Sequence, residues 1–156
     1  MNRNYYFISF SYFARMTLLE KHLVIKRSGI PGAGKGLYTK VSIPKGTLIT
    51  EYKGKNTTWK DVVHDEGRNG YIYYVKRSHV IDASGNKKML ARYANDAQGL
   101  VKKKGIRNNC EYVVEGLRVF IQAKKNIPAC SEILVAYGNE YWSVIKYNKK
   151  LEEKGK

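Results

Sequence analysis

The stretch that decides the fold is Glu132-Ile-Leu-Val-Ala-Tyr-Gly138, an apolar run that ends at a glycine. Taken alone, it predicts a buried strand followed by a turn, and the Tyr141-Trp142 pair beyond it is typical of packing. Two upstream segments gain meaning only in combination with it. They are Ala91-Arg-Tyr-Ala-Asn-Asp96, which alone predicts a helix end with an Asn-Asp turn, and the glycine-rich Gly29-Ile-Pro-Gly-Ala-Gly-Lys-Gly36.

The glycine-rich segment superficially matches a phosphate-binding loop. Gly29, Gly34 and Lys35 satisfy the pattern G-x-x-x-x-G-K, but Gly36 stands where a Ser or Thr hydroxyl would hold magnesium. The next residues, Leu37–Val41, are strand-like, whereas a phosphate loop needs a helix N-terminus at that point. Two interpretations stay open: a plain hairpin turn, or a loop whose backbone approaches a ligand closely, which serial glycines permit.

Length and composition exclude several classes of protein. A chain of 156 residues suits one domain, and 43% hydrophobic residues argue against wholesale disorder. Two cysteines are too few for a disulfide framework or a four-cysteine zinc cluster, which favours a reducing compartment; Cys110 and Cys130 are expected to be buried, inert thiols. The three histidines lack metal-ligand spacing, and no stretch reaches the ~18 apolar residues of a membrane helix.

Most of the chain predicts a mostly β domain built of short strands with small helical inserts. Strands are expected at Leu23–Lys26, Leu37–Val41, Thr47–Tyr52, Gly70–Val75, Ser78–Ile81, Glu111–Val114, Arg118–Ala123 and Glu132–Tyr137. Weak helix signals lie at Thr57–Val63 and Lys88–Asn95. We expect an N-terminal extension over residues 1–16, the domain over 17–142, and a charged helix or tail over 143–156.

The order of the motifs resembles that of the SET-domain family of S-adenosylmethionine-dependent protein-lysine methyltransferases. The resemblance covers about Leu19 to Trp142, and although each motif is weak, their collinearity is specific. The segments similar to family motifs are Ala33–Tyr38 (first glycine motif), Glu51–Gly54 (E-Y-x-G), Val80–Ala83 (V-I-D-A), Arg92–Asp96 (R-F-x-N-H), Asn109–Tyr112 (the following strand) and Phe120–Tyr137 (the closing strand).

This resemblance implies a fold and a site. The fold would be a mostly β, β-clip-like SET domain of several small sheets with short helices, whose C-terminal strand threads beneath a preceding loop as a pseudoknot. Cofactor and peptide would enter from opposite faces and meet through a lysine channel. The resemblance is to compact bacterial or viral members without zinc-binding flanks, and it implies no metal.

The resemblance also assigns roles to residues, with S-adenosylmethionine as the cofactor. Tyr137 would be the catalytic tyrosine, orienting the amine rather than acting as a full base, because an unperturbed tyrosine with a pKa of ~10 is a poor base. The cofactor-binding residues would be Ala33, Gly34, Lys35, Gly36, Asn95, Asp96 and Trp142. The substrate-binding residues would be Tyr71, Tyr73 and Val135, the last where many relatives carry an aromatic residue that sets the methyl count.

Some residues depart from the family pattern. Asp96 replaces the usual histidine, Ala97-Gln98 follows instead of a cysteine, Cys130-Ser131 replaces Gly-Glu, and a basic insert spans Leu100–Arg107. An alternative therefore stays open: a catalytically weak or inactive SET-like module that binds nucleic acid through Lys102–Lys104 and Arg107, or binds a protein partner.

The net charge of +16 bears on the partner. A lysine methyltransferase must accept a basic protein, so either the acidic residues cluster at the peptide groove, or the charge holds the enzyme near DNA, where basic packaging proteins are targets. The candidates for an acidic cluster are Asp61, Asp65, Glu66 and Asp96. The expected location is cytoplasmic, at the nucleoid, or in a host nucleus if the protein is viral, without membrane contact. The sequence identifies neither the substrate nor the oligomeric state.

Overall fold

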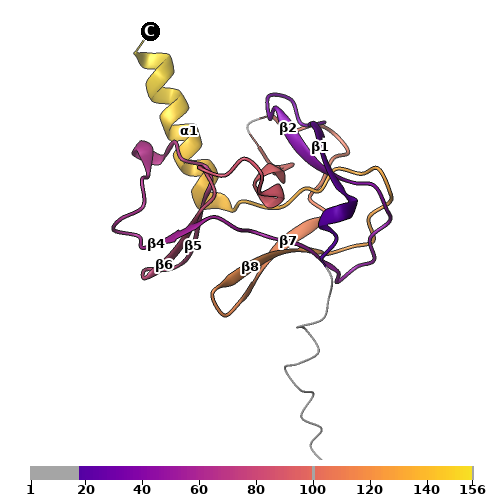
Figure 1. Ribbon diagram of the computed structural model, residues 1–156. Coiled ribbons are helices and arrows are strands. Elements are labelled where there is room, and N and C mark those ends of the chain that lie inside the picture. Colours follow the sequence, from indigo (N-terminus) through magenta and orange to yellow (C-terminus); the bar gives the residue numbers. More distant parts are fainter. Residues whose placement is uncertain (1–17, 100, 156) are drawn as a thin grey trace, which may run out of the picture.

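The computed structural model describes residues 18–99 and 101–155. The N-terminal extension expected over residues 1–16 lies outside them. Within the described part, eight strands form three small antiparallel sheets, joined by short 3-10 helices and followed by one α-helix (Figure 1). The mostly β fold expected from the sequence is therefore confirmed.

The first sheet is a hairpin of β1 (Leu23–Arg27) and β2 (Lys35–Thr39), which follows the 3-10 helix η2 (Glu20–His22). The glycine-rich segment is its loop, closed by a hydrogen bond of 2.8 Å from the Ser28 amide to the Gly34 carbonyl. Gly34 has a φ of 71°, in the left-handed region that glycine adopts without steric cost. A strand rather than a helix follows the loop, which excludes a phosphate-binding loop.

The second sheet has the order β3 (Leu48–Glu51), β8 (Arg118–Ala123), β7 (Cys110–Glu115). Strand β8 lies in the centre, and its residues 119–121 are buried. Fully buried aliphatic residues from this sheet and its surroundings form the core, among them Leu37, Ile43, Ile49, Ile121, Ile127, Ile133 and Val135. Burial of such side chains, at about 1.5–3 kcal/mol each, is the main force that holds the sheets together.

The third sheet has the order β4 (Lys55–Thr57), β6 (His79–Asp82), β5 (Ile72–Lys76). The helix expected over Thr57–Val63 is wrong, because Thr57 pairs with Val80 in the sheet and the following residues make only a turn. Short 3-10 helices form instead at η3 (Asp65–Gly67) and at η4 (Leu90–Tyr93), where a helix was expected over Lys88–Asn95.

The closing segment, residues 132–137, is not the regular strand that its apolar run predicts. It makes isolated bridges to three separate parts of the chain, at Tyr38, Asn95 and Cys110. No single strand runs alongside it for more than one residue pair, so a continuous ladder does not form.

The closing segment also threads through the fold. The Val135 amide donates to the Asn95 carbonyl at 2.8 Å, and on the other side the Cys110 amide donates to the Leu134 carbonyl at 2.9 Å. Asn95 and Cys110 flank the loop between Asp96 and Asn108, whose ends are joined by a side-chain hydrogen bond of 2.8 Å. The segment thus passes between the two ends of that loop, which is the expected pseudoknot.

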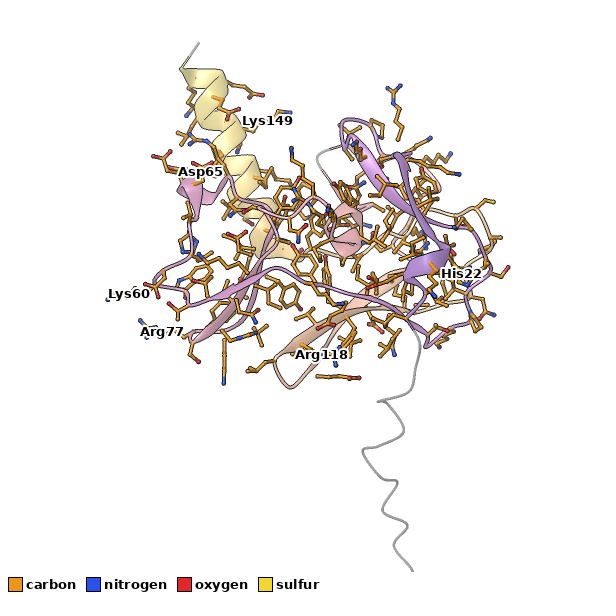
Figure 2. The ribbon with its side chains drawn as sticks, in the orientation of Figure 1. His22, Lys60, Asp65, Arg77, Arg118 and Lys149 are labelled. Carbon is orange, nitrogen blue, oxygen red and sulfur yellow. The ribbon has the colours of Figure 1, made fainter. Side chains whose placement is uncertain are left out.

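Helix α1 (Asn139–Lys154) follows directly and projects away from the sheets (Figure 1). It has no buried residue. Charged side chains such as Lys60, Arg77 and Arg118 lie at the periphery (Figure 2). Among the described residues, no helix is both long and apolar enough to cross a membrane.

The two cysteines have different environments. Cys110 is fully buried, and burial raises its thiol pKa to about 12. Cys130 is exposed, so the expectation that both thiols are buried is wrong for it. Its φ of 64° lies in the left-handed region, which glycine adopts without steric cost and cysteine does not.

Candidate functional site

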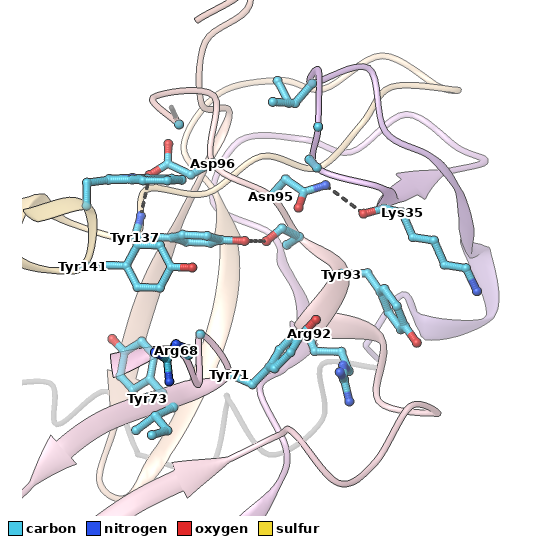
Figure 3. Close-up of a pocket in the computed structure, with 18 of the residues that line it drawn as sticks. Lys35, Arg68, Tyr71, Tyr73, Arg92, Tyr93, Asn95, Asp96, Tyr137 and Tyr141 are labelled. Carbon is cyan, nitrogen blue, oxygen red and sulfur yellow. Dashed lines mark hydrogen bonds between the residues drawn. The ribbon is translucent and has the colours of Figure 1, made fainter. Parts of the chain in front are cut away.

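A cavity of about 640 Å³ lies among the glycine-rich loop, β5, η4 and the closing segment (Figure 3). Its size is typical of sites for small-molecule ligands and cofactors. Tyrosines dominate its wall: seven of the thirteen in the chain line it, namely Tyr52, Tyr71, Tyr73, Tyr93, Tyr112, Tyr137 and Tyr141.

Tyr137 is fixed at both its backbone and its hydroxyl. The hydroxyl donates to the Ala94 carbonyl at 2.7 Å, and the backbone amide donates to the Asp96 carboxylate at 2.8 Å (Figure 3). Its ring is nearly parallel to that of Trp142, with an interplanar angle of 12°. Burial raises the pKa of Tyr137 well above its ordinary value, so the hydroxyl is neutral at physiological pH.

The Asp96 carboxylate accepts four hydrogen bonds in this part of the site. One carboxylate oxygen accepts from the Gln98 amide at 2.7 Å and from Asn108 Nδ2 at 2.8 Å; the other accepts from the Tyr137 amide and from Trp142 Nε1, each at 2.8 Å. The residue is 4% exposed and lines the cavity. Its side chain therefore holds together the loop end, the closing segment and the start of α1.

Asn95 joins the glycine-rich loop to the closing segment. Its Nδ2 donates to the Lys35 carbonyl at 2.9 Å and, at 3.3 Å, to the Glu132 carboxylate. Of the residues expected to bind a cofactor, Ala33, Lys35, Asn95, Asp96 and Trp142 line the cavity, whereas Gly34 and Gly36 do not.

Glu132 was not predicted as a site residue, although it opens the stretch that decided the fold. Its carboxylate accepts from Ser28 Oγ at 2.6 Å, from the Gly29 amide at 2.8 Å and from the Tyr38 hydroxyl at 3.1 Å. Gly36 is required beside it, because a Cβ there would overlap the carboxylate. Glu132 thus sets the shape of the glycine-rich loop, and only the tertiary fold reveals this role.

A cluster of aromatic rings forms the floor of the cavity. Tyr52, Tyr73 and Tyr112 pack in tilted or edge-to-face pairs with centroids 4.9–5.9 Å apart. Burial raises the pKa of each, so all three hydroxyls are neutral. Tyr71 and Tyr73 line the cavity as expected of substrate-binding residues, whereas Val135 is fully buried in the core and does not line it.

Arg92 is a cavity residue that sequence reasoning left unassigned. Its guanidinium lies over the Tyr71 ring at 4.0 Å from the centroid, and Nη1 donates to the Ala83 and Ser84 carbonyls at 2.8 and 2.9 Å. Its buried Nε has no hydrogen-bond partner within residues 18–99 and 101–155. Arg92 lines the cavity, and the positive charge of its guanidinium suits an anionic group on a ligand.

The family assignment follows from a comparison with protein-family models. The model described as "SET domain" matches residues 34–138, which include the end of the glycine-rich segment, the Asn95-Asp96 pair and Tyr137. The chain belongs to the SET-domain family. The glycine-rich loop, η4 and the closing segment, which meet at the cavity, therefore correspond to the motifs of a SET domain.

One relative of this SET domain is "Histone-lysine N-methyltransferase set-17" of Caenorhabditis elegans. The two are 27% identical over 121 residues, which cover 75% of this chain and 41% of the relative. The chain thus spans about two fifths of the length of the relative that it matches. Methyl transfer is supported at the level of the family, whose methyltransferases generally use S-adenosylmethionine.

The four acidic residues named as candidates for a cluster at the peptide groove have different surroundings. Of its four candidates, Asp96 lines the cavity, whereas Asp61, Asp65 and Glu66 do not. Asp61 accepts from the Thr58 hydroxyl, and Glu66 pairs with Arg68 at 2.9 Å. No group of three or more His, Cys, Asp or Glu side chains suited to a metal ion occurs in the described ranges.

Proposed function

We propose that this SET domain transfers a methyl group from S-adenosylmethionine to the ε-amine of a lysine in a basic protein. The observation that carries the proposal is the position of Tyr137. Its hydroxyl is fixed by the Ala94 carbonyl inside a tyrosine-lined cavity that also contains Asn95 and the edge of the glycine-rich loop.

The residues of the cavity are chemically suited to this cofactor. Asn95 holds the loop through the Lys35 carbonyl, and residues 30–33 of the loop form part of the cavity wall. The positive charge of Arg92 at the cavity wall suits the carboxylate of an amino acid moiety. Bound there, the cofactor would supply a methyl group on a positively charged sulfur.

The chain itself would contribute orientation and a dry environment. The faces of Tyr52, Tyr73 and Tyr112 attract cations and exclude water, which favours an alkylamine chain next to a sulfonium. Tyr137, neutral because burial raises its pKa, would accept or donate one hydrogen bond and aim the lysine nitrogen at the methyl carbon. The cofactor, when bound, would supply the methyl carbon and leave as a neutral thioether, and these residues would hold the lysine nitrogen in line with it.

The lysine must lose its proton before attack, and no residue of the cavity is required to take it as a strong base. Tyr137 is unsuited to do so as a tyrosinate, since burial opposes its ionisation. We infer that the proton goes to water as the amine approaches the bound cofactor, because repulsion from the sulfonium disfavours the ammonium form there.

The test is a pair of measurements on the full chain. Calorimetric titration measures binding of S-adenosylmethionine, and radiolabelled cofactor with basic proteins measures transfer by the wild type and by Tyr137→Phe. We expect binding by both proteins and transfer reduced by about 10²-fold or more in the variant. Absence of both cofactor binding and labelling in the wild type would contradict the proposal.

The partner and product follow as finer proposals. A basic, histone-like or DNA-packaging protein is the proposed substrate, with action in the cytoplasm or close to DNA. Mass spectrometry of the product would count the methyl groups, for which the small Val135 sets no obvious limit.

A weaker contact with nucleic acid is a second proposal. It would be made by the basic loop, the part of the chain introduced above as the basic insert, and it is favoured by the exposure of Lys102, Lys103, Lys104 and Arg107.

A further inference from the structure

Asp96 contributes an unusual charge to the wall of the cavity. Its carboxylate is buried, yet all four groups that donate to it are neutral: two backbone amides, the Asn108 amide and the Trp142 indole. Within the part of the chain that the structure describes, no Lys, Arg or His forms an ion pair with it. None of these four donors brings a positive charge to the carboxylate.

A buried charge without a counter-ion costs free energy, so its retention at a ligand cavity calls for a compensating cation. The cations that line the cavity, Lys35, Arg68, Arg92 and Lys149, are not paired with Asp96. A cationic ligand is the remaining source of compensation. Of the two molecules in a methyl-transfer pair, S-adenosylmethionine carries a sulfonium charge at the reacting centre, whereas its product, S-adenosylhomocysteine, is an uncharged thioether there.

We propose that Asp96 is a specificity-determining residue that makes the cavity prefer the charged methyl donor over the neutral product. The inference rests on the proposed function and deepens it. The residue acts through space, and it does so from a fixed position because its hydrogen bonds to Tyr137 and Trp142 join it to two walls of the cavity. Preference for the donor limits product inhibition, since the spent cofactor dissociates more readily.

The carboxylate of Asp96 also affects two neighbouring tyrosine hydroxyls. Burial is the main cause that raises the pKa of Tyr137 and of Tyr141, and the negative charge of Asp96 adds to it at both hydroxyls. Both tyrosines line the same cavity. The field that disfavours a tyrosinate at these positions favours a cation placed among them.

The experiment measures the dissociation constants of S-adenosylmethionine and S-adenosylhomocysteine, without protein substrate, for four proteins. They are the wild type, Asp96→Asn and Asp96→His, which remove the charge, and Asp96→Glu, which keeps it. The control is Asp82→Asn, another partly buried aspartate with hydrogen bonds to Ser84 and Asn69 but outside this cavity. Circular dichroism and thermal melting report which variants fold.

The ratio of the two constants is decisive, because a loss of folded protein or a distorted cavity weakens both ligands alike. We expect the neutral variants to lose about tenfold of the preference for the charged ligand, with the ratio kept in Asp96→Glu and in the control. An unchanged ratio in a folded neutral variant would overturn the inference while leaving the proposed function intact. Failure of the wild type to bind either ligand would instead overturn both.

Discussion

At the scale of single residues, the site depends on groups that have several partners each. Asp96 and Glu132 each accept four hydrogen bonds, and together they fix Tyr137, Trp142 and the glycine-rich loop. Removing one partner of such a group leaves a buried polar atom unpaired, at a cost of about 1–3 kcal/mol. Single substitutions here are therefore expected to change ligand binding before they change the fold.

The pH dependence of transfer tests the neutral state of Tyr137. Because burial raises its pKa well above the ordinary value of a tyrosine, the residue stays protonated as the pH rises, while more of the substrate lysine becomes uncharged and reactive. We expect the rate of single-turnover transfer to rise with pH up to about 10, near the ordinary pKa of lysine.

Tyrosinate absorbance at 295 nm provides the check on this profile. Tyr74→Phe, which alters an exposed tyrosine away from the cavity, is the control. A rate that falls above pH 9 in step with ionisation of a tyrosine that is absent from Tyr137→Phe would contradict the neutral assignment.

Gly36→Ala tests the contact between the glycine-rich loop and Glu132. The added Cβ would overlap the Glu132 carboxylate, which is held by its own hydrogen bonds and has little freedom to move. We expect at least tenfold weaker binding of S-adenosylmethionine in a calorimetric titration, with loss of about 1–3 kcal/mol of stability. Gly85→Ala is the matched control, since a Cβ there meets no atom within 4 Å; equal affinities for both variants would refute the role of Glu132.

At the scale of the elements, the accuracy of sequence-based prediction depends on whether local pattern or tertiary contact decides the structure. The β-branched and aromatic run in Arg118–Ala123 predicted β8 with its observed bounds, because such side chains favour a strand buried in the centre of a sheet. The apolar run Glu132–Tyr137 failed as a regular strand, since its partners come from three distant segments. The prediction of a helix over Thr57–Val63 was wrong because Thr57 pairs with Val80 of β6, and the local sequence does not indicate that pairing.

The sequence predicted those residues of the candidate site that belong to family motifs. Residues from those motifs, such as Lys35, Asn95 and Tyr137, converge on one cavity. Arg92 and Glu132 were missed as members of the site because their partners are distant in sequence: carbonyls after β6 for Arg92 and the β1–β2 hairpin for Glu132. Spacing alone contains no record of such contacts.

The turn before the closing segment offers a stabilising substitution. Cys130 has a φ of 64°, a conformation that costs a non-glycine residue roughly 1–2 kcal/mol. Cys130→Gly removes that strain and returns part of the gain through greater freedom of the unfolded chain, so we expect a net stabilisation of about 0.5–1 kcal/mol. Urea denaturation measures the effect, with Cys130→Ala as the control, and equal midpoints for the two variants would contradict the account.

At the scale of the whole molecule, the net charge of +16 bears on the proposed contact with nucleic acid rather than on the proposed chemistry. Lys124 and Lys125 lie beside the base of the basic loop, since the Lys124 amide donates to the Asn109 carbonyl at 3.0 Å. Exposed cations from two loops thus lie at one end of the second sheet, where phosphates of nucleic acid would find contacts.

Salt dependence tests that contact. We expect binding of duplex DNA to weaken steeply with salt, and replacement of Lys102, Lys103 and Lys104 by Gln to reduce the slope of log K against log salt by about 3. The control replaces Lys146, Lys150 and Lys154 of α1, which changes net charge equally. Equal slopes for the two triple variants would show that net charge alone, and not this loop, attracts the DNA.

The threaded closing segment has a consequence for how the protein is made. The ribosome synthesises residues 132–137 after every strand of the three sheets. These late residues nevertheless include Tyr137, and they form the bridges to Asn95 and Cys110. A nascent chain that stops short of them has its sheets but lacks both Tyr137 and the Glu132 carboxylate that holds the glycine-rich loop. We therefore expect fragments that end before residue 132 to lack the proposed methyl transfer, because the residues proposed to carry it are made last.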